Sequence, residues 1–425
     1  IVISALPGSR ELFSRDWMTT RVRFCASACP MESTLGGLGR RARHNVAMDA
    51  ASLLQRLVVI ESVNPSLDAQ GAGEASIAAF IADWAQSQGL SAEMIGTPER
   101  PSVLVRGGRG QTGRRLVFGA HLDTVGLAGS VDGITPRIEG DRLYARGAYD
   151  MKAGLAAALI ACRDAAHAGI EGEVIVAAVA DEEATSVGIQ DALAIMNPGS
   201  IDGAIIAEPT ERRIGTAHRG FVWTEFTITG VAAHGSRPQL GADAILATAP
   251  LLAALADLDA RLRTRPHPFL GPGNLHASTI SGGVEGSTIP DRCSLLVERR
   301  TLPGESLASI EDDITQLLDA LPTADPRVTI TAKTVLYRPP METPGDAEIL
   351  AALRAAVPDA ELAPMSYWAD SAFLSDAGIP TVLYGPEGEG AHADIEWVSL
   401  SGTQATAETF TRVAIAFCAA PTTGR

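Results

Sequence analysis

Apolar residues recur along this chain at two different spacings from about Asp49 onward. Helical spacing predicts amphipathic helices over residues 49–60 and 73–89, and an Ala/Leu-rich helix over residues 151–169. Short apolar runs between these segments predict strands at residues 102–106, 115–120, 173–180 and 203–207. Strands that alternate with helices in this way indicate an α/β domain, in which a sheet lies between two layers of helices.

The pattern changes after about Thr216, where apolar and polar residues begin to alternate as in a half-exposed strand. Strands are predicted at residues 221–230, 275–281, 292–300 and 327–333, and helices at residues 241–263 and 304–321. The order β-α-β-β-α-β predicts an antiparallel sheet covered on one face by two helices. Strand and helix alternation resumes from about Asp346. We therefore expect a discontinuous first domain, residues 48–216 and 334–425, with an inserted α+β domain of residues 217–333.

Length and composition agree with a soluble protein of two domains. The chain has 425 residues, more than a single core comfortably holds, with 46% apolar and 20% charged residues. Its net charge of −16 argues against binding to the phosphate backbone of nucleic acids, which requires a basic surface. No run of 18 or more apolar residues occurs, so no membrane-spanning helix is predicted.

Residues 1–47 differ from the rest, with seven arginines against three acidic residues and little hydrophobic periodicity. We expect a poorly ordered N-terminal extension there, and an Arg-rich transit peptide remains an alternative. The five cysteines fit neither a disulfide framework nor a zinc knuckle, because their number is odd and three of them are isolated. They are Cys25, Cys29, Cys162, Cys293 and Cys418. Cys162 and Cys418 are expected to be buried and unreactive, and a reducing compartment, the cytoplasm, is favoured.

Acidic and histidine side chains follow the predicted strands, at the edge where α/β sheets bind ligands. His121 and Asp123 come directly after the strand at residues 115–120. The ring of His121 is a candidate metal ligand with Asp123 oriented behind it, and the alternative is a loop-end aspartate that caps a turn. Asp150 precedes the helix at residues 151–169. It is a candidate bridge between two cations, and the alternative is an ordinary helix N-cap.

Four more candidates follow later strands. Glu182 and Glu183 come after the run EVIVAAVAD, where adjacent residues of an extended chain point to opposite sides. One glutamate can therefore bind a cation while the other faces the water to be activated, and a solvated acidic loop is the alternative. Glu208 ends the strand GAIIA, and His392 lies in the Gly-rich loop YGPEGEGAHADIEWV. A solvated loop residue is the alternative for His392, but the set as a whole is the ligand inventory of a two-metal hydrolase.

Six motifs, taken in order, resemble the dinuclear zinc family of acetylornithine deacetylase, succinyl-diaminopimelate desuccinylase, carboxypeptidase G and aminoacylase. They are HLDTV, GAYDMKAG, DEE, EPT, AHGSRP and GAHADIEWV, and the match runs from about residue 49 to the C-terminus. As a set these motifs are specific, and they imply a role for each candidate residue. His121 and Glu208 would bind one zinc ion, Glu183 and His392 the other, with Asp150 as bridge, Glu182 as general base and Asp123 supporting His121. The resemblance also implies a cis peptide bond between Asp150 and Met151.

In many relatives the inserted domain is a lid that pairs with its twin in a two-fold dimer. His234 in AHGSRP and Arg292 in IPDRC match positions that hold a carboxylate or carbonyl oxygen of the substrate. The resemblance implies that His234 reaches the metal site of the neighbouring subunit, and a loop residue that supports GSRP is the alternative. Ser287 stands where the family often has asparagine, so this polar substrate contact differs here. His218 lies near the predicted hinge, where a structural role is the alternative to a functional one.

We therefore expect a zinc-dependent amide hydrolase that acts on a small N-acyl amino acid or a related carboxylate, like a deacetylase or desuccinylase. Two Zn²⁺ ions per subunit, with Co²⁺ as a substitute, would activate a water whose proton Glu182 accepts. A carboxypeptidase or dipeptidase is one alternative, and a non-catalytic relative that binds metal or small ligands is another. A two-metal phosphoesterase is disfavoured because no basic phosphate cradle accompanies the ligands. The expected partners are a carboxylate substrate and a second copy of the chain, with no nucleic acid and no membrane.

Overall fold

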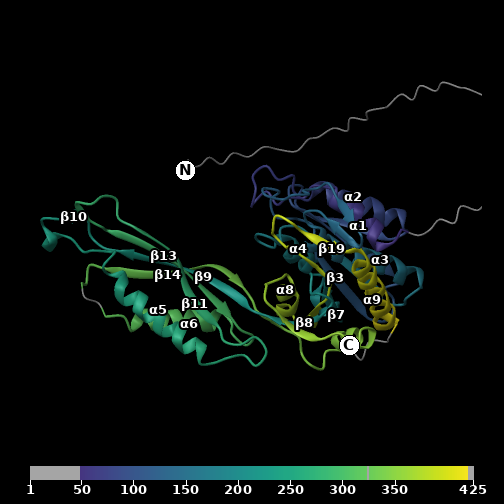
Figure 1. The fold of residues 1–425 in the computed structure, drawn as a ribbon. Helices are drawn as coiled ribbons and strands as arrows, with labels where there is room; N and C mark the ends of the chain where they lie inside the picture. Colours follow the sequence, from purple (N-terminus) through teal and green to yellow (C-terminus); the bar gives the residue numbers. More distant parts are fainter. Residues whose placement is uncertain (1–47, 323–324, 420–425) are drawn as a thin grey trace, which may run out of the picture. The chain divides into compact units, whose positions relative to one another are not determined.

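The computed structural model describes residues 48–322 and 325–419 (Figure 1). The prediction for residues 1–47, with Cys25 and Cys29, lies outside the described residues. Cys162, Cys293 and Cys418 are buried free thiols, as predicted for the first and the last of them. In the part of the chain that is described, no helix combines the length and the apolar character needed to cross a membrane.

The largest sheet mixes parallel and antiparallel strands in the order β1-β2-β6-β3-β7-β17-β8-β15, with β16 beside β8. Its strands are β1 (Ser91–Gly96), β2 (Pro101–Gly108), β3 (Arg115–His121), β6 (Glu173–Val179), β7 (Gly203–Ile206), β8 (Ile214–His218), β15 (Met341–Glu342), β16 (Leu362–Met365) and β17 (Thr381–Leu383). The central strands β6, β3, β7 and β17 run parallel to one another. Their carboxyl ends therefore meet at one edge of the sheet, where His121 ends β3 and where Glu183 and Glu208 follow β6 and β7.

Helices cover both faces of this sheet. They are α1 (Ala50–Val58), α2 (Ala75–Ser87), α3 (Ala153–His167), α4 (Val187–Met196), α7 (Glu348–Ala356), α8 (Ser371–Asp376) and α9 (Leu400–Ala419). Leu116 and Phe118 of β3 pack in one core with α1, α2, α3, α7 and α9, whereas Val117 packs in a second core with α4 and α8. This alternation buries both sides of each central strand, which explains their nearly continuous apolar sequences. The predicted α/β sheet between helix layers is confirmed.

One glycine lets α3 approach the end of β7 very closely. A Cβ atom at Gly154 would lie 1.8 Å from the carbonyl oxygen of Ala207, so only glycine permits this contact. Ala207 precedes Glu208, and Gly154 follows Asp150 at the start of α3. The contact therefore fixes the spacing between two segments that carry predicted metal ligands.

A four-stranded antiparallel sheet with the order β11-β13-β9-β14 lies within residues 220–338. Its strands are β9 (Gly220–Thr229), β11 (Asn274–Gly282), β13 (Arg292–Thr301) and β14 (Thr329–Arg338), and its helices are α5 (Thr248–Arg263) and α6 (Leu307–Asp319). Both helices lie on one face of the sheet, around a core of its own (Figure 1). The predicted β-α-β-β-α-β order is confirmed.

Two details of the insertion differ from the sequence analysis. Helix α5 begins at Thr248 instead of residue 241, because the side chain of Asp243 accepts hydrogen bonds from the N–H groups of Ile245 and Leu246 and forms a turn. Strand β14 continues to Arg338, five residues beyond the predicted end. The limits of an inserted domain at residues 217–333 stay a prediction.

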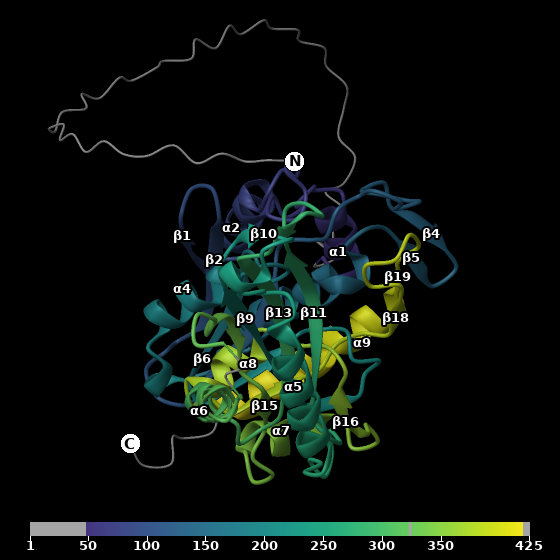
Figure 2. The same cartoon turned by 90° about the vertical axis from the view of Figure 1, so that its left-hand side faces the viewer.

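Two small sheets were not predicted, because strands of two or three residues carry no readable periodicity. One has the order β18-β19-β5-β4 and places residues 137–144 beside residues 388–399 (Figure 2). Its strands are β4 (Arg137–Glu139), β5 (Arg142–Tyr144), β18 (Gly388–Glu389) and β19 (Trp397–Ser399). The other joins β10 (Ala233–His234) to β12 (Thr288–Ile289). Short helical turns cover Ala148–Lys152, Pro198–Ser200 and Pro238–Leu240.

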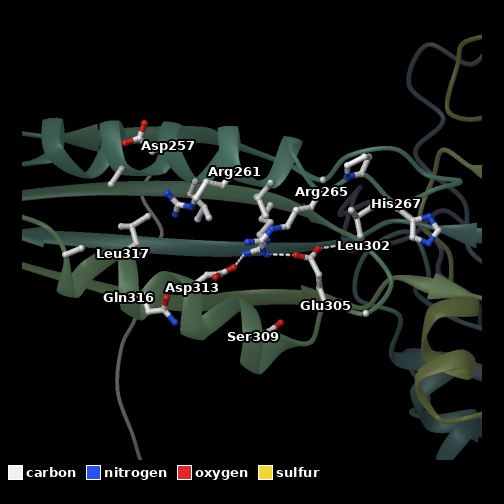
Figure 3. A pocket seen from close by; sticks show the side chains of 18 of the residues that line it. Asp257, Arg261, Arg265, His267, Leu302, Glu305, Ser309, Asp313, Gln316 and Leu317 are labelled. Carbon is white, nitrogen blue, oxygen red and sulfur yellow. Dashed lines mark hydrogen bonds and ion pairs between the residues drawn. The ribbon is translucent and has the colours of Figure 1, made fainter.

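A buried arginine occupies a core-facing position of β13. Arg299 donates to Asp313 over 2.7 Å and also bonds Glu305, and it lines a groove of about 1130 Å³ between α5 and α6. Figure 3 shows Glu305 and Asp313 pointing into this groove. Glu305 accepts a second hydrogen bond from the N–H of Leu302, so the ion pair ties the start of α6 to the end of β13.

Replacing Arg299 with alanine should lower the free energy of unfolding by about 2 kcal/mol, because two carboxylates lose their cation. The loss stays below that of a fully buried pair, since the side chains of Glu305 and Asp313 are 23% and 40% exposed. Arg263→Ala, which breaks an exposed pair with Asp259 on α5, should cost less than about 0.5 kcal/mol. Urea unfolding measures both variants, and equal losses would contradict a stabilising role for the buried pair.

Candidate active site

The predicted metal ligands converge into two groups that share one residue. The first group contains His121, Asp150 and Glu208, and the second contains Asp150, Glu183 and His392. Within each group one ligand atom per residue lies within 4.8 Å of the others. Every residue predicted as a metal ligand therefore belongs to at least one group.

Asp150 directs one carboxylate oxygen toward each group. Its Oδ1 lies 3.2 Å from Nε2 of His121, and its Oδ2 lies 3.3 Å from Nε2 of His392. The carboxylate of Glu208 is 3.8 Å from the same nitrogen of His121, and that of Glu183 is 3.1 Å from the ring of His392. The arrangement suits two cations that share the carboxylate of Asp150.

The main-chain carbonyl and the side-chain carboxylate of Asp123 contact different neighbours. Its carbonyl oxygen lies 2.9 Å from Nδ1 of His121, which leaves Nε2 facing the acidic cluster. Its carboxylate is 3.8 Å from that ring and accepts the N–H groups of Glu182 and Glu183, each over 3.2 Å. The main chain of Asp123 thus orients the imidazole, and its side chain fixes the backbone of the glutamate pair.

The charged groups of this cluster lie close enough to shift one another's pKa values. Burial raises the pKa of Glu182 and of Glu208, and the nearby carboxylates raise both further. Burial alone would lower the pKa of His121, but its hydrogen bond to Asp150 and the charge of Glu208 raise it well above the usual range. Hydrogen bonds to Asp150 and Glu183 raise the pKa of His392 to about 10. Without cations the cluster therefore retains protons at positions that divalent cations would occupy.

The donor set fits zinc or a similar divalent cation. Two imidazoles and three carboxylates supply nitrogen and oxygen ligands of the kinds that zinc binds. Divalent cations would neutralise carboxylates that are otherwise buried beside one another. The peptide bond between Asp150 and Met151 is cis, as predicted.

Three residues that support the glutamate pair were missed by the sequence analysis. Asn64 is fully buried, and its amide donates to the carboxylates of Asp123 and Asp181 over 2.8 and 3.0 Å. Arg100 donates to the amide oxygen of Asn64 over 3.0 Å and also pairs with Asp181. Asp181 has a left-handed backbone, with φ of 69°, directly before Glu182. Asn64 and Arg100 stand in segments without a metal-binding motif, so only the fold reveals this network.

A further acid lies beside the cluster. Asp370 is 3% exposed, and it lines the same small internal space as Glu182 and Glu208. Burial raises its pKa to about 7. Nothing in the segment YWADSAF distinguishes this aspartate from an ordinary helix N-cap, which explains why the sequence analysis missed it.

The residues predicted to contact substrate lie at one end of the β11-β13-β9-β14 sheet. His234 pairs with Thr288 across β10 and β12, and the carbonyl of Ser287 accepts the N–H of Gly235. Arg292 is exposed at the start of β13. Within residues 48–322 and 325–419, no hydrogen bond or ion pair joins His234, Ser287 or Arg292 to the two metal-binding groups.

Among the described residues, the hydrogen bonds of His234 leave one ring nitrogen free, whereas those of His218 occupy both ring nitrogens. Nδ1 of His234 accepts the N–H of Ser236 over 3.1 Å, so the neutral ring carries its proton on Nε2 and presents a donor there. His218 is fully buried between the carbonyl of Arg219 and the hydroxyl of Ser371. Burial lowers the pKa of His218 to about 4, which agrees with the structural alternative for this residue.

The sequence matches a known protein family and a named relative. The model of peptidase family M20/M25/M40 matches residues 117–416. The acetylornithine deacetylase of Proteus mirabilis is 28% identical over 388 residues, which cover 87% of this chain and 96% of that protein.

Two solved structures share the fold. The aminopeptidase PepT of Bacillus cereus superposes with a TM-score of 0.68 at 18% identity, over 87% of this chain and 98% of that one. The YXEP protein of Bacillus subtilis, a dinuclear metal-binding peptidase, gives a TM-score of 0.66 at 14% identity over 87% and 97% of the two chains.

Adding cobalt(II) to metal-stripped protein should raise its thermal unfolding midpoint, because bound cations replace repulsion among the buried carboxylates. Each occupied site should add about 2.7 kcal/mol of stability at a free cobalt concentration one hundred times its Kd. Differential scanning calorimetry measures the shift. The variant Asp150→Ala, which lacks the shared carboxylate, should respond much less. An unchanged midpoint in the unmodified protein would argue against a metal centre here.

Proposed function

Because the chain belongs to peptidase family M20/M25/M40, we propose that it hydrolyses the amide bond of a small N-acyl amino acid or a related carboxylate. Family membership makes it a hydrolytic enzyme that acts on C–N bonds. The observation that carries the finer proposal is the carboxylate of Asp150, with one oxygen facing each histidine beside Glu182. A deacetylase-like or desuccinylase-like activity is further supported by the similarity to acetylornithine deacetylase along 96% of that enzyme.

Two zinc ions, with cobalt as a substitute, are the proposed cofactors. One ion would be held by His121, Glu208 and Asp150, and the other by Asp150, Glu183 and His392. When bound, such ions polarise an amide carbonyl and lower the pKa of a water molecule.

Glu182 is the proposed general base. It belongs to neither ligand group, so its carboxylate stays free to accept a proton from water and to pass it to the leaving amine. Its N–H is bound by the carboxylate of Asp123, which holds the backbone in place.

Recognition of the substrate is assigned to three residues. Nε2 of His234 would donate to the carbonyl oxygen of the scissile amide, since Ser236 occupies Nδ1. The planar guanidinium of Arg292 would bind the substrate carboxylate through paired hydrogen bonds. Ser287, next to β12, would supply a polar contact.

A two-fold dimer through residues 217–333 is the proposed assembly, and its surface includes the edge of the sheet. Among the described residues, strand β11 has a partner on one side only, so its outer N–H and C=O groups are available for pairing. Ile280 of this strand is 55% exposed, Val284 is 89% exposed and Leu246 is 72% exposed. A second copy of the chain would cover these apolar side chains.

A substrate screen tests the function. N-acetyl, N-succinyl and N-formyl amino acids and dipeptides are assayed with zinc-loaded and cobalt-loaded protein, each as the free acid and as the methyl ester. We expect N-acyl amino acids to be hydrolysed, with a markedly lower kcat/KM for the esters. Preference for dipeptides would replace the proposal by a dipeptidase, and binding without turnover would replace it by a non-catalytic relative.

Glu182→Gln and Glu183→Gln should fail for different reasons. The first removes the proton acceptor and keeps the ligands, so kcat should fall by about two to four orders of magnitude while both cations stay bound. The second removes a ligand, so cation affinity should fall first. Steady-state kinetics and metal analysis of the same samples separate the two cases. Nearly normal turnover of Glu182→Gln would exclude this residue as the base.

His234 should act on the metal site of the neighbouring subunit. Glu182→Ala and His234→Ala proteins should each be nearly inactive, whereas a heterodimer of the two should recover one working site in two. In that heterodimer the His234→Ala subunit keeps its own Glu182 and receives an intact His234 from its partner. The purified heterodimer is assayed after subunit exchange has been verified. Persistent inactivity would place His234 in its own chain's site.

A further inference from the structure

A single buried glutamate binds the whole loop that carries Asp150. Glu396 is 3% exposed, and its carboxylate accepts four hydrogen bonds from this loop. The donors are Nη1 of Arg146 and the N–H of Gly147 on Oε2, at 2.9 Å each, and the N–H groups of Tyr149 and Asp150 on Oε1, at 2.9 and 3.1 Å.

These donors need an acceptor outside their own segment. The backbone of Asp150 is not helical, with φ of −114° and ψ of 94°, although α3 begins shortly after it. The N–H groups of residues 147, 149 and 150 therefore point at Glu396, and without it they would be buried and unpaired. The carboxylate thus determines where the backbone of Asp150 can lie.

Glu396 also belongs to the loop that carries His392, and Arg146 reinforces the link between the two loops. The ion pair between Arg146 and Glu396 spans 2.9 Å, and its side chains are 3% and 2% exposed. Nη2 of Arg146 donates to the carbonyl of Ala393 over 2.9 Å, directly after His392. Its Nε donates to the carbonyl of Gly126 over 3.3 Å. Segments about 250 residues apart in sequence are therefore joined at one buried ion pair.

His392 depends on this link more than the other ligands do. Its backbone is left-handed, with φ of 63°, and its side chain is 54% exposed. Its ring bonds Glu183 and pairs with Asp150, and among the described residues no other group holds that ring. Of the remaining ligands, His121 ends β3, Glu208 and Glu183 follow β7 and β6 by two and four residues, and Asp150 precedes α3.

We propose that Glu396 and Arg146 are positioning residues that set the distance between the shared carboxylate of Asp150 and the ring of His392. In this role they determine how tightly the group of Asp150, Glu183 and His392 binds its cation. The inference rests on the proposed two-cation function and adds residues that contact no cation themselves. Changes to Glu396 or Arg146 should weaken binding of the second group's cation more than that of the first group's, because only the second group contains His392.

Titration of metal-stripped protein with cobalt(II), followed by calorimetry and visible absorption, tests the proposal. His392→Ala first identifies which of the two binding steps belongs to the group of His392. Glu396→Gln keeps the size of the side chain but turns one acceptor into an amide that faces two donors. Its Kd for that same step should rise about 10- to 100-fold, with a smaller change in the other step.

Glu389→Gln is the matched control, since it removes the same charge three residues before His392 from an exposed strand position. Its two Kd values should stay within about twofold of those of the unmodified protein, because Glu389 belongs to neither ligand group and solvent screens an exposed charge. Arg146→Lys is the second variant. It keeps a cation beside Glu396 but loses the forked bonds to Ala393 and Gly126, and about a tenfold rise is expected.

Circular dichroism establishes whether each variant is folded. If Glu396→Gln does not fold, the Kd values of Arg146→Lys test the positioning role. Unchanged Kd values in the folded variants, with two cobalt ions still bound, would overturn the positioning role alone. Fewer than two ions in the unmodified protein would instead contradict the two-cation function on which it rests.

Discussion

Burial of several carboxylates at the carboxyl ends of parallel strands is the constraint on which this structure depends. Carboxylates so close together repel one another unless each finds a hydrogen-bond donor, a proton or a cation. Asp123 is bound by two backbone N–H groups and by Asn64, while Asp150 lies between two imidazoles. Burial, and then the neighbouring carboxylates, raise the pKa values of Glu182 and Glu208. The buried carboxylates therefore carry more negative charge than their neighbours neutralise, at the place where two divalent cations would fit.

Two arginines, Arg146 buried and Arg100 partly buried, hold the loops around this acidic cluster. Arg100 reaches the glutamate pair through Asn64 and Asp181, and Arg146 reaches Asp150 through Glu396. Each arginine pairs with a carboxylate that belongs to neither ligand group, Asp181 for Arg100 and Glu396 for Arg146. Charge-assisted hydrogen bonds therefore hold these loops in place, although the loops lie outside regular helices and strands.

The β11-β13-β9-β14 sheet has a hydrophobic core of its own. Its two helices pack on one face, and the buried ion pair of Arg299 ties α6 to β13. Its tip carries His234 and Ser287, which no hydrogen bond or ion pair of the described residues joins to the metal-binding groups. A separate core would let this part present the proposed substrate-binding groups without distorting the strands that position the candidate ligands.

The sequence alone determined the two kinds of sheet and the residues at the strand ends, because periodicity and chain order are local properties. His121, Asp150, Glu183, Glu208 and His392 could be chosen in this way, and the structure brings them together, while the roles assigned to them stay predictions. Only the tertiary structure decided which atoms of Asp123 face the ring and which face the glutamates. Likewise, Asn64 bonds Asp123 59 residues away and Glu396 bonds Arg146 250 residues away, and no spacing along the chain encodes hydrogen bonds between such distant segments.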